Sequence, residues 1–298
     1  MAHLSVLKKE VLDLLAPKEN ENFIDATGGA AGHTLEILKA NGPQGKVLCL
    51  DWDESALLRI KEKITAEKGI DLERLILVEG NFGEIGKIVR ENNFKNVFGI
   101  LADLGLSSDQ LEESGRGFSF LKNERLDMRF SEKNDLTAED IINEWPEEKL
   151  EEILKNFGEE KFSRSISREI CRRRKLKNIE TVNDLVEIIA EALPLRFRRG
   201  RLHFATRTFQ ALRLAVNGEL DNLKNFLPQS LEILANGGRL AVISFHSLED
   251  RIVKNFFREA ARDGRAEILT KKPITPSMEE IKDNPRSRSA KLRTILKK

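Results

Sequence analysis

The chain has 298 residues, of which 40% are apolar and 33% are charged, and its formal net charge is +1. This length allows one large α/β domain, alone or carrying a smaller one. The longest apolar runs are only strand-length and the first residues resemble no signal peptide, so we expect neither a membrane protein nor a secreted one. The only two cysteines, Cys49 and Cys171, cannot form a disulfide framework, and we expect a reducing, cytoplasmic setting.

The N-terminal third alternates apolar strands with helical patterns. A helix is expected over 4–15, before Pro17, and strands are expected at 23–27, 46–51, 75–80 and 97–103. The intervening helices should begin near Gly32, Asp53 and Phe82. Nearly continuous apolar strands that alternate with helices predict a parallel sheet covered on both faces.

This rhythm stops after Asp103 and resumes about a hundred residues later. From 111 to 204 the pattern is helical and charged, with capping-box signals at 137–140 and 181–184. Helices at 205–216 and 219–234, a strand at 239–245, a helix at 247–261 and strands at 266–271 and 291–296 follow. We therefore predict an α/β fold in which 1–110 and 205–298 form one domain and 111–204 is an inserted helical domain.

The turn after the first strand indicates a nucleotide-type site. Residues 28–32 read Gly-Gly-Ala-Ala-Gly, which does not fit the spacing G-x-G-x-x-G, and Ala30 and Ala31 interrupt the glycines. Asp25, just before the turn, would repel a pyrophosphate but would suit the ammonium of a methionine moiety. Asp51, after the second strand, can take a ribose diol. These features favour S-adenosylmethionine over a dinucleotide.

Polar residues also follow the fourth and fifth core strands. Asp103 should share the carboxyl edge of the sheet with Asp51 and is a candidate for the site, although an Asx turn is the alternative. His246 ends the strand expected at 239–245 and could touch a substrate base. Part of that motif needs no functional explanation, because Ser247 is a natural N-cap with Asp250 three residues further on.

The charges are unevenly distributed. Segment 132–160 has eleven acidic and three basic residues, whereas 161–213 has fourteen basic and five acidic ones. The clusters at 172–175 and 196–201 favour contact with nucleic acid over a merely solvated helix face. The loop at 114–130 combines Arg116 and Arg129 with phenylalanines, so it could grip a phosphate and stack a base, or equally pack its own rings.

Two other chemistries find no support in the sequence. The four histidines, at positions 3, 33, 203 and 246, and the two cysteines have no metal-ligand spacing, so we expect no metal site. No G-x-S-x-G elbow is present to indicate a hydrolytic serine.

Several longer motifs occur in order along the chain. They are Asp25-Ala-Thr with Gly32-His33, Asp103-Leu-Gly-Leu-Ser-Ser, Arg116-Gly-Phe-Ser-Phe, Leu126-Asp-Met-Arg, Ala205-Thr-Arg-Thr-Phe-Gln-Ala-Leu-Arg, Val216-Asn217, Phe245-His-Ser-Leu-Glu-Asp-Arg-Ile-Val-Lys and Asn284-Pro-Arg-Ser-Arg-Ser-Ala. Together they resemble the 16S rRNA (cytosine-N4)-methyltransferase family, RsmH, formerly MraW, over nearly the whole chain. The resemblance implies a class I Rossmann-like methyltransferase sheet with a helical insert, S-adenosylmethionine as cofactor, and a cytidine in the decoding centre of the small ribosomal subunit as target.

The resemblance also implies positions for the site residues. Cofactor contacts carry over to Ala31, Gly32, His33, Asp51, Phe82, Asp103 and Gln110. The sequence departs from the family pattern at Ala30-Ala31, where a glycine pair and an arginine are usual, and a methyl at Ala31 would crowd the ligand if φ there is positive. It also departs at 202–204, where Leu-His-Phe replaces the more usual His-Pro.

Methyl transfer to N4 requires positioning and an acceptor for one N4 proton. Asp103 or a nearby backbone carbonyl is the candidate acceptor, and the alternative is that Asp103 only holds the cofactor or its loop. Candidate RNA contacts are Arg116, Phe118, Phe120, Arg129, Arg198, Arg199, Arg201 and His246, and Phe245 is a further stacking surface. Two other functions stay open: a non-catalytic RNA-binding or ribosome-assembly protein on the same fold, and a Rossmann-type NAD-dependent oxidoreductase.

Overall fold

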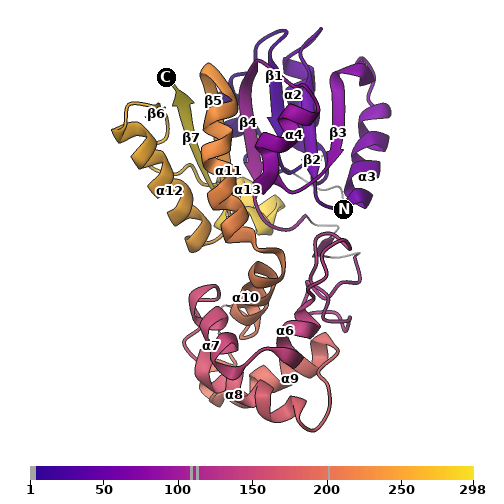
Figure 1. Ribbon diagram of the computed structural model, residues 1–298, viewed down its shortest axis with the longest axis vertical. Helices are drawn as coiled ribbons and strands as arrows, with labels where there is room; N and C mark the ends of the chain where they lie inside the picture. Colours follow the sequence, from indigo (N-terminus) through magenta and orange to yellow (C-terminus); the bar gives the residue numbers. More distant parts are fainter. Residues whose placement is uncertain (1–4, 108–109, 112–113, 201) are drawn as a thin grey trace. The chain divides into compact units, whose positions relative to one another are not determined.

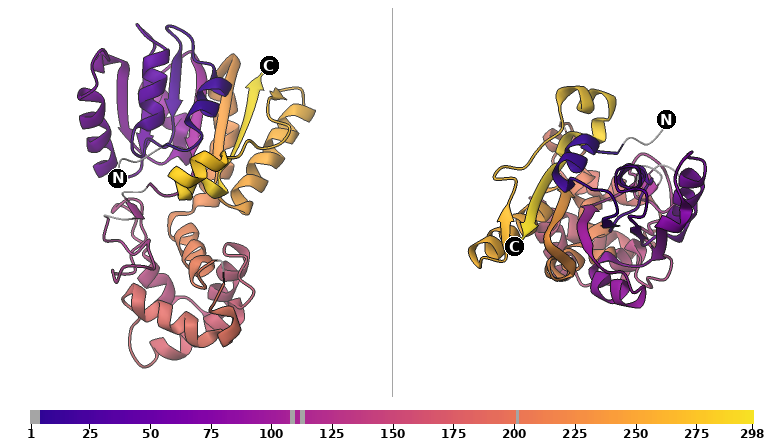
Figure 2. Two further views of the ribbon diagram at one scale, coloured as in Figure 1. Left: turned by 180° about the vertical axis from the view of Figure 1, so that it is seen from behind. Right: turned by 90° about the horizontal axis from the view of Figure 1, so that it is seen from above.

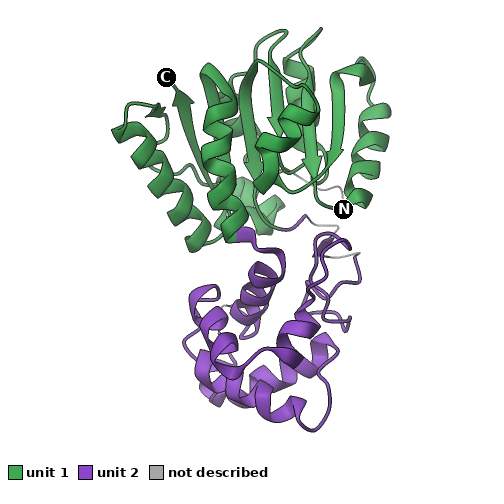
Figure 3. Cartoon of the chain, in the orientation of Figure 1, with its two compact units in different colours: residues 1–105, 220–298 green, residues 106–219 purple. Residues whose placement is uncertain are grey.

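The computed structural model describes residues 5–107, 110–111, 114–200 and 202–298 (Figure 1). The chain divides into two compact units, which Figure 3 colours separately. The sheet unit comprises residues 1–105 and 220–298, and the helical unit comprises 106–219. The second boundary falls at 219 rather than at 204, because helix α10 (Thr206–Asn217) buries Phe209, Leu212 and Val216 in the core of the helical unit.

The sheet unit has seven strands in the order β3-β2-β1-β4-β5-β7-β6. Their bounds are β1 (Asn22–Asp25), β2 (Val47–Asp51), β3 (Leu75–Glu79), β4 (Val97–Asp103), β5 (Leu234–Ser244), β6 (Ala266–Ile268) and β7 (Lys291–Lys297). The first five are parallel, and β7 pairs antiparallel with both β5 and β6. The strand order reverses between β1 and β4, and ligands bind outside the carboxyl ends of the strands at such a point.

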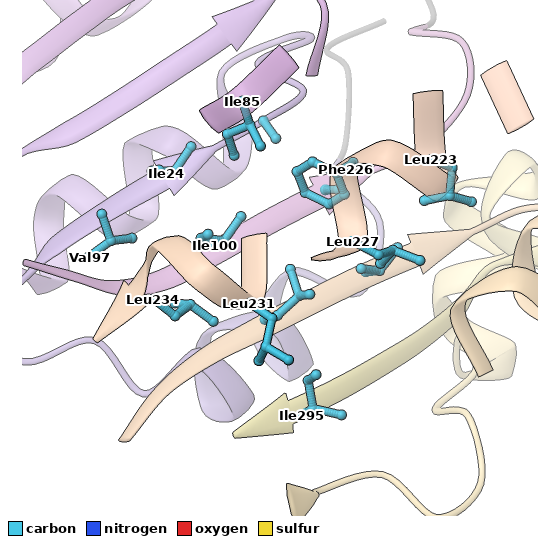
Figure 4. Packing of buried hydrophobic residues seen from close by; sticks show 14 of the residues in the cluster. Ile24, Ile85, Val97, Ile100, Leu223, Phe226, Leu227, Leu231, Leu234 and Ile295 are labelled. Atoms are coloured by element: carbon cyan, nitrogen blue, oxygen red, sulfur yellow. The ribbon is translucent and has the colours of Figure 1, made fainter. Parts of the chain in front are cut away.

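Helices cover both faces of this sheet, as Figures 1 and 2 show from opposite sides. One face is covered by α4 (Ile85–Glu91), α11 (Glu219–Ile233) and α12 (Ser247–Arg262). Figure 4 shows their core, in which Phe226 and Leu231 of α11 pack with Ile100 of β4. The opposite face is covered by α1 (Lys8–Leu15), α2 (Gly32–Ala40) and α3 (Glu54–Thr65). The strands are apolar along their length because both faces are buried.

Shorter elements complete the sheet unit. They are the 3₁₀ helices η1 (Leu72–Arg74), η2 (Phe82–Glu84) and η4 (Pro285–Ser289), and the helix α13 (Met278–Asp283). Each of the three segments η1, η2 and α13 begins at a side-chain cap, at Asp71, Asn81 and Ser277 respectively.

The helical unit is built from α6 (Ala138–Glu144), α7 (Glu147–Asn156), α8 (Ser163–Arg174), α9 (Val182–Ala192), the 3₁₀ helix η3 (Leu195–Phe197) and α10. The two predicted capping boxes are confirmed: Thr137 pairs with Asp140 at the start of α6, and Thr181 pairs with Asp184 at the start of α9. This unit has an apolar cluster of its own, to which Phe118 from the preceding loop contributes.

Candidate functional site

Three acidic residues stand at the carboxyl ends of adjacent strands. Asp25 ends β1 and is aligned with Cys49 of β2 and Leu101 of β4. Asp51 and Asp103 each lie two residues further along their strands, and both are partly exposed. The parallel register therefore brings Asp51 and Asp103 to the same edge, on either side of the turn that follows β1.

The turn at 28–32 has to run very close to β2. Gly28 N donates to Leu50 O at 2.7 Å, and a Cβ on Gly28 would lie 2.6 Å from both Cys49 Sγ and Ile60 Cδ1. Gly29 has a φ of 51° and donates its N–H to Asp51 Oδ2 at 2.8 Å. The small residues in this turn are thus required by its close approach to β2 and by its left-handed backbone.

Ala31 precedes α2 and has a φ of 64°. Its φ is positive, which is the condition under which we expected the methyl to crowd a ligand. However, the residue is fully buried and belongs to the apolar cluster on the α1–α3 face. The methyl therefore fills the core instead of lying exposed at the edge. A Cβ on Gly32, next in the chain, would meet Ser5 Oγ, so the Ser5 side chain would have to turn away to make room for it.

Asp25 is 1% exposed and forms its hydrogen bonds inside the turn. Its Oδ2 accepts a hydrogen bond from Thr34 Oγ1 at 2.6 Å, and its Oδ1 accepts one from Thr27 N at 3.2 Å. Burial raises the pKa of Asp25 to about 6, which outweighs the lowering effect of these bonds. Asp25 thus stabilises the turn through hydrogen bonds inside it. The contact with an ammonium group that the sequence suggested stays a prediction.

Asp51 is fixed by backbone groups on both sides. Its Oδ1 accepts from Asp53 N at 2.9 Å and its Oδ2 accepts from Gly29 N. Burial raises the pKa of Asp51 to about 6 as well, against the two backbone bonds that favour the charged form. The carboxylate is therefore held in one orientation at the end of β2, as a receptor for a diol must be.

His33 and Asp103 form the polar centre of the edge. His33 Nε2 lies 3.7 Å from Asp103 Oδ2, and the histidine is only 7% exposed. Within the described part of the chain, both ring nitrogens of His33 and Oδ1 of Asp103 are buried and lack a hydrogen-bond partner. Buried polar atoms are rarely left unpaired in a folded protein. A polar ligand at this edge would supply the missing partners.

The remaining residues expected to contact the cofactor lie in different units. Phe82 opens η2 just after β3 and packs edge-on against Phe226, with ring centroids 5.4 Å apart. Gln110 belongs to the helical unit, where its Oε1 accepts from Ser107 N at 3.1 Å.

The chain matches the MraW methylase family over residues 1–298. It belongs to this family. Three relatives called "Ribosomal RNA small subunit methyltransferase H" are similar along their whole length. The protein from Persephonella marina is 47% identical over 291 residues, covering 98% of this chain and 97% of its own. Those from Clostridium botulinum (45%, 99% and 98% covered) and Koribacter versatilis (44%, 100% and 94% covered) are nearly as similar.

Among solved structures the similarity is weaker. TrmN from Thermus thermophilus aligns with a TM-score of 0.47 at 12% identity, over 98% of this chain and 48% of its own.

This MraW-family methyltransferase uses S-adenosylmethionine, and the residues at the sheet edge fit that cofactor. A carboxylate at the end of β2 suits a ribose diol, and the unpaired nitrogens of His33 and the free Oδ1 of Asp103 offer partners to its polar groups. In the part of the chain that the structure describes, no group of His, Cys, Asp and Glu side chains could hold a metal ion. Nor does any described helix have the length and apolar character needed to cross a bilayer.

His246 lies just after β5, as expected, and it also begins the next helix. It is the N-cap of α12, accepting from Glu249 N at 3.4 Å through Nδ1, and Glu249 completes the capping box. The cap therefore falls one residue before Ser247, and its partner is Glu249, not Asp250. Asp250 pairs instead with Arg293 of β7 at 2.6 Å, and this contact lowers the pKa of Asp250. Nδ1 of His246 thus caps the helix, whereas its Nε2 is buried and has no hydrogen-bond partner among the described residues, so contact with a substrate base stays a prediction.

The two arginines of the 114–130 loop are engaged within the loop. Arg116 donates to Phe130 O at 2.9 Å. Arg129 makes a two-pronged ion pair with Asp127 and donates to Asn134 O at 2.7 Å. Phe118 is 6% exposed and stacks on Phe130, with centroids 5.7 Å apart. An irregular loop leaves carbonyls without a ladder partner, and the guanidinium groups satisfy them. These side chains therefore hold the loop together.

The basic cluster at 172–175 is also largely compensated. Arg172 pairs with Glu169, and Arg173 pairs with Glu191 at 2.8 Å. Arg174 donates to the carbonyls of Ile142 and Trp145 at 2.8 and 2.7 Å. The three arginines of this cluster therefore have partners, which come from α8 itself, from α9 and from the end of α6, although segment 161–213 as a whole has few acids.

The second basic segment is more open. Arg199 is exposed, and Arg198 donates only a 3.2 Å bond to Leu193 O. Arg201 lies outside the described residues. Phe120 stacks face to face with His203, with centroids 4.4 Å apart. None of His203, Phe162 and Phe197 was predicted as a site residue. The signal that could have found them is the alternation of aromatic and basic residues over 196–207.

Proposed function

We propose that this protein transfers the methyl group of S-adenosylmethionine to N4 of a cytidine in the decoding centre of small-subunit rRNA. The observation that carries the proposal is the full-length match to the MraW methylase family, combined with the His33–Asp103 pair at the switch point of the sheet. In this pair both ring nitrogens of His33 and Oδ1 of Asp103 are buried without a hydrogen-bond partner among the described residues. The relatives' name supports an rRNA of the small subunit as the substrate class.

The residues at the sheet edge divide the work of binding. When bound, the cofactor supplies an electrophilic methyl group on a sulfonium. Asp51 receives the ribose diol on a carboxylate that Gly29 and Asp53 hold still. Phe82 begins η2 just after β3, the strand beside β2, and is our candidate for an apolar contact with the cofactor. Gly32 and His33 begin α2, whose first N–H groups face the carboxyl edge of the sheet.

Asp103 is our candidate for the proton acceptor. The N4 lone pair is delocalised into the ring, so drawing one N4 proton toward a carboxylate favours attack. Oδ1 of Asp103 has no partner among the described residues, while the main-chain N–H of Asp103 is fixed on Thr27 Oγ1 at 2.7 Å. The backbone is therefore anchored and one carboxylate oxygen is available. A role in holding only the cofactor is the alternative that mutation must decide.

The helical unit is the part of the chain that we assign to RNA. Its open basic segment, 196–199, carries three arginines and an exposed phenylalanine. We place the activity in the cytoplasm, since both cysteines are free and buried, as in proteins of reducing compartments.

The test is methylation of isolated small ribosomal subunits with labelled S-adenosylmethionine, followed by mapping of the modified nucleotide. We expect one N4-methylated cytidine in the decoding centre. Binding of the cofactor without methylation of subunits or of free rRNA would instead support a non-catalytic assembly protein. Binding of NAD in place of S-adenosylmethionine would support the oxidoreductase.

A further inference from the structure

The helical unit contains a cavity that the reaction centre does not use. It has a volume of about 290 Å³, which is at the small end of the range for ligand pockets and is suited to one group of nucleoside size. Its lining comes from the start of α8, the end of α9 and the segment leading into α10. The lining residues are Glu160, Lys161, Phe162, Leu193, Phe197, Gly200, Leu202, His203, Phe204 and Arg207. All of them belong to the helical unit.

Aromatic rings form much of the wall. Phe162 and Phe197 are in contact, with centroids 4.9 Å apart, and Phe197 is 45% exposed. His203 is stacked between Phe120 and Phe204, with centroids 4.4 and 4.3 Å away. A large exposed aromatic ring beside a cavity is a stacking platform, because every nucleobase has a π-face to place on it.

The imidazole of His203 is a neutral part of this wall. Burial lowers the pKa of His203, so the ring is uncharged at neutral pH. Its Nδ1 accepts from Ala205 N at 3.3 Å, which places the ring proton on Nε2. Because its faces are stacked on Phe120 and Phe204, His203 contributes an uncharged ring edge with one N–H donor to the wall.

Charges around the cavity distinguish a base from a phosphate. Glu160 contributes a buried carboxylate to the lining, and its Oε1 accepts from Phe162 N at 2.9 Å. A phosphate would be repelled there, whereas an amino or imino N–H of a base would be accepted. Lys161 and Arg207 line the same cavity, and Arg196 lies over the Phe197 ring at 4.9 Å. These cations suit the phosphates on either side of an inserted base.

We propose that this cavity binds one unpaired nucleobase of the RNA, other than the cytosine that is methylated. The proposal rests on the proposed function for the identity of the RNA. In this arrangement the helical unit holds a neighbouring nucleotide out of its stack and thereby fixes the strand. The base stacks on Phe197 while its flanking phosphates meet Lys161 and Arg207.

The experiment uses the full-length protein and a single-stranded oligouridylate that carries one 2-aminopurine and no cytosine. Stacking of the probe on an aromatic ring quenches its fluorescence. We expect quenching with the wild type, and an affinity about 10-fold or more lower for Phe197→Ala. Phe197→Trp should restore both. Leu195→Ala is the matched control, because Leu195 is 74% exposed in the same segment but does not line the cavity.

Equal affinities for Phe197→Ala and Leu195→Ala would overturn the proposal. So would weaker binding by Phe197→Ala without any quenching in the wild type, because the segment would then touch only the RNA backbone. The assay contains neither cofactor nor target base, so it is independent of catalysis. If subunit methylation failed while this binding persisted, the proposed function would fall and the base pocket would stand.

Discussion

His33 Nε2 and Asp103 Oδ2 lie 3.7 Å apart at the carboxyl edge of the sheet, although seventy residues separate them in the chain. One begins α2 and the other ends β4, the strand beside β1 at the switch point. Neither nitrogen of the imidazole has a hydrogen-bond partner among the described residues. The fold thus places polar groups at the edge that a bound ligand would complete.

Replacing the carboxylate of this pair tests its chemical role. If Asp103 accepts the N4 proton, Asp103→Asn should lower the single-turnover rate on small subunits by about 10²–10⁴-fold, the usual worth of a positioned base. Calorimetry should then give nearly unchanged affinity for S-adenosylmethionine. A variant with weak cofactor binding but a normal rate at saturation would show that Asp103 only holds the cofactor.

Asp51 should contribute directly to cofactor affinity. Asp51→Ala removes a charged acceptor and should weaken S-adenosylmethionine binding by about 1.5–3 kcal/mol in calorimetry. Asp71→Ala is the matched control, since Asp71 also accepts a backbone N–H, from Glu73 at 2.9 Å, but caps the exposed η1. Equal affinities for the two variants would place the cofactor elsewhere.

Ala31 has a left-handed backbone that costs a residue with a Cβ about 1–2 kcal/mol. Ala31→Gly removes this strain but also removes a buried methyl and adds freedom to the unfolded chain, so the free energy of unfolding should change by less than about 1 kcal/mol. Ala241→Gly, in β5 of the same cluster, gains no such relief and should lower the free energy of unfolding by more than about 1 kcal/mol. Urea unfolding compares the two.

Cofactor affinity of Ala31→Gly is a separate measurement. Since the methyl is buried in the core, we expect calorimetry to give little change. A large gain in affinity would mean that the methyl does crowd the ligand, as the sequence suggested.

Asp25 should make stability depend on pH in a particular direction. Its folded pKa of about 6 lies above the unfolded value near 3.9, so the folded state holds the proton more tightly. Its contribution to the free energy of unfolding is largest below pH 4 and is lost as the pH rises through 6. Between pH 4 and pH 7, the free energy of unfolding of Asp25→Asn should therefore rise by up to about 3 kcal/mol relative to that of the wild type. Urea unfolding at several pH values measures this difference. A constant difference across that range would contradict the raised pKa.

The arginines at positions 198, 199 and 201 should govern the salt dependence of RNA binding. On a single strand, removing one cation that touches a phosphate should flatten the slope of log affinity against log salt by about 0.7. For Arg198→Ser, Arg199→Ser and Arg201→Ser combined, we expect this flattening once for each of the three arginines that touches a phosphate, with unchanged affinity for S-adenosylmethionine. The control combines Arg172→Ser and Arg173→Ser, which remove arginines already paired with Glu169 and Glu191. Should the control flatten the slope more, the RNA would lie along α8.

Local patterns in the sequence were enough to predict the parallel strands, their helices and the acids that end β2 and β4, but not the antiparallel pairing of β7 with β5 and β6. Apolar residues recur at short intervals in strands and helices, so a local stretch of sequence reveals them. The carboxyl ends of parallel strands lie at the same edge of the sheet. The capping boxes of α6 and α9 were predictable for the same reason, because cap and partner are three residues apart. The family motifs, being local as well, indicated the cofactor.

Only the tertiary structure decided which polar side chains already have partners within the protein. Arg173 pairs with Glu191, eighteen residues away, and Arg174 donates to the carbonyl of Ile142. No local sequence pattern predicts either contact. Packing likewise decided that α10 joins the helical unit and that Phe197 stands beside Phe162 at a cavity. A guanidinium group or an aromatic ring can either make contacts within the protein or bind a ligand. Which of the two it does depends on the groups that the folded chain places within a few ångströms of it.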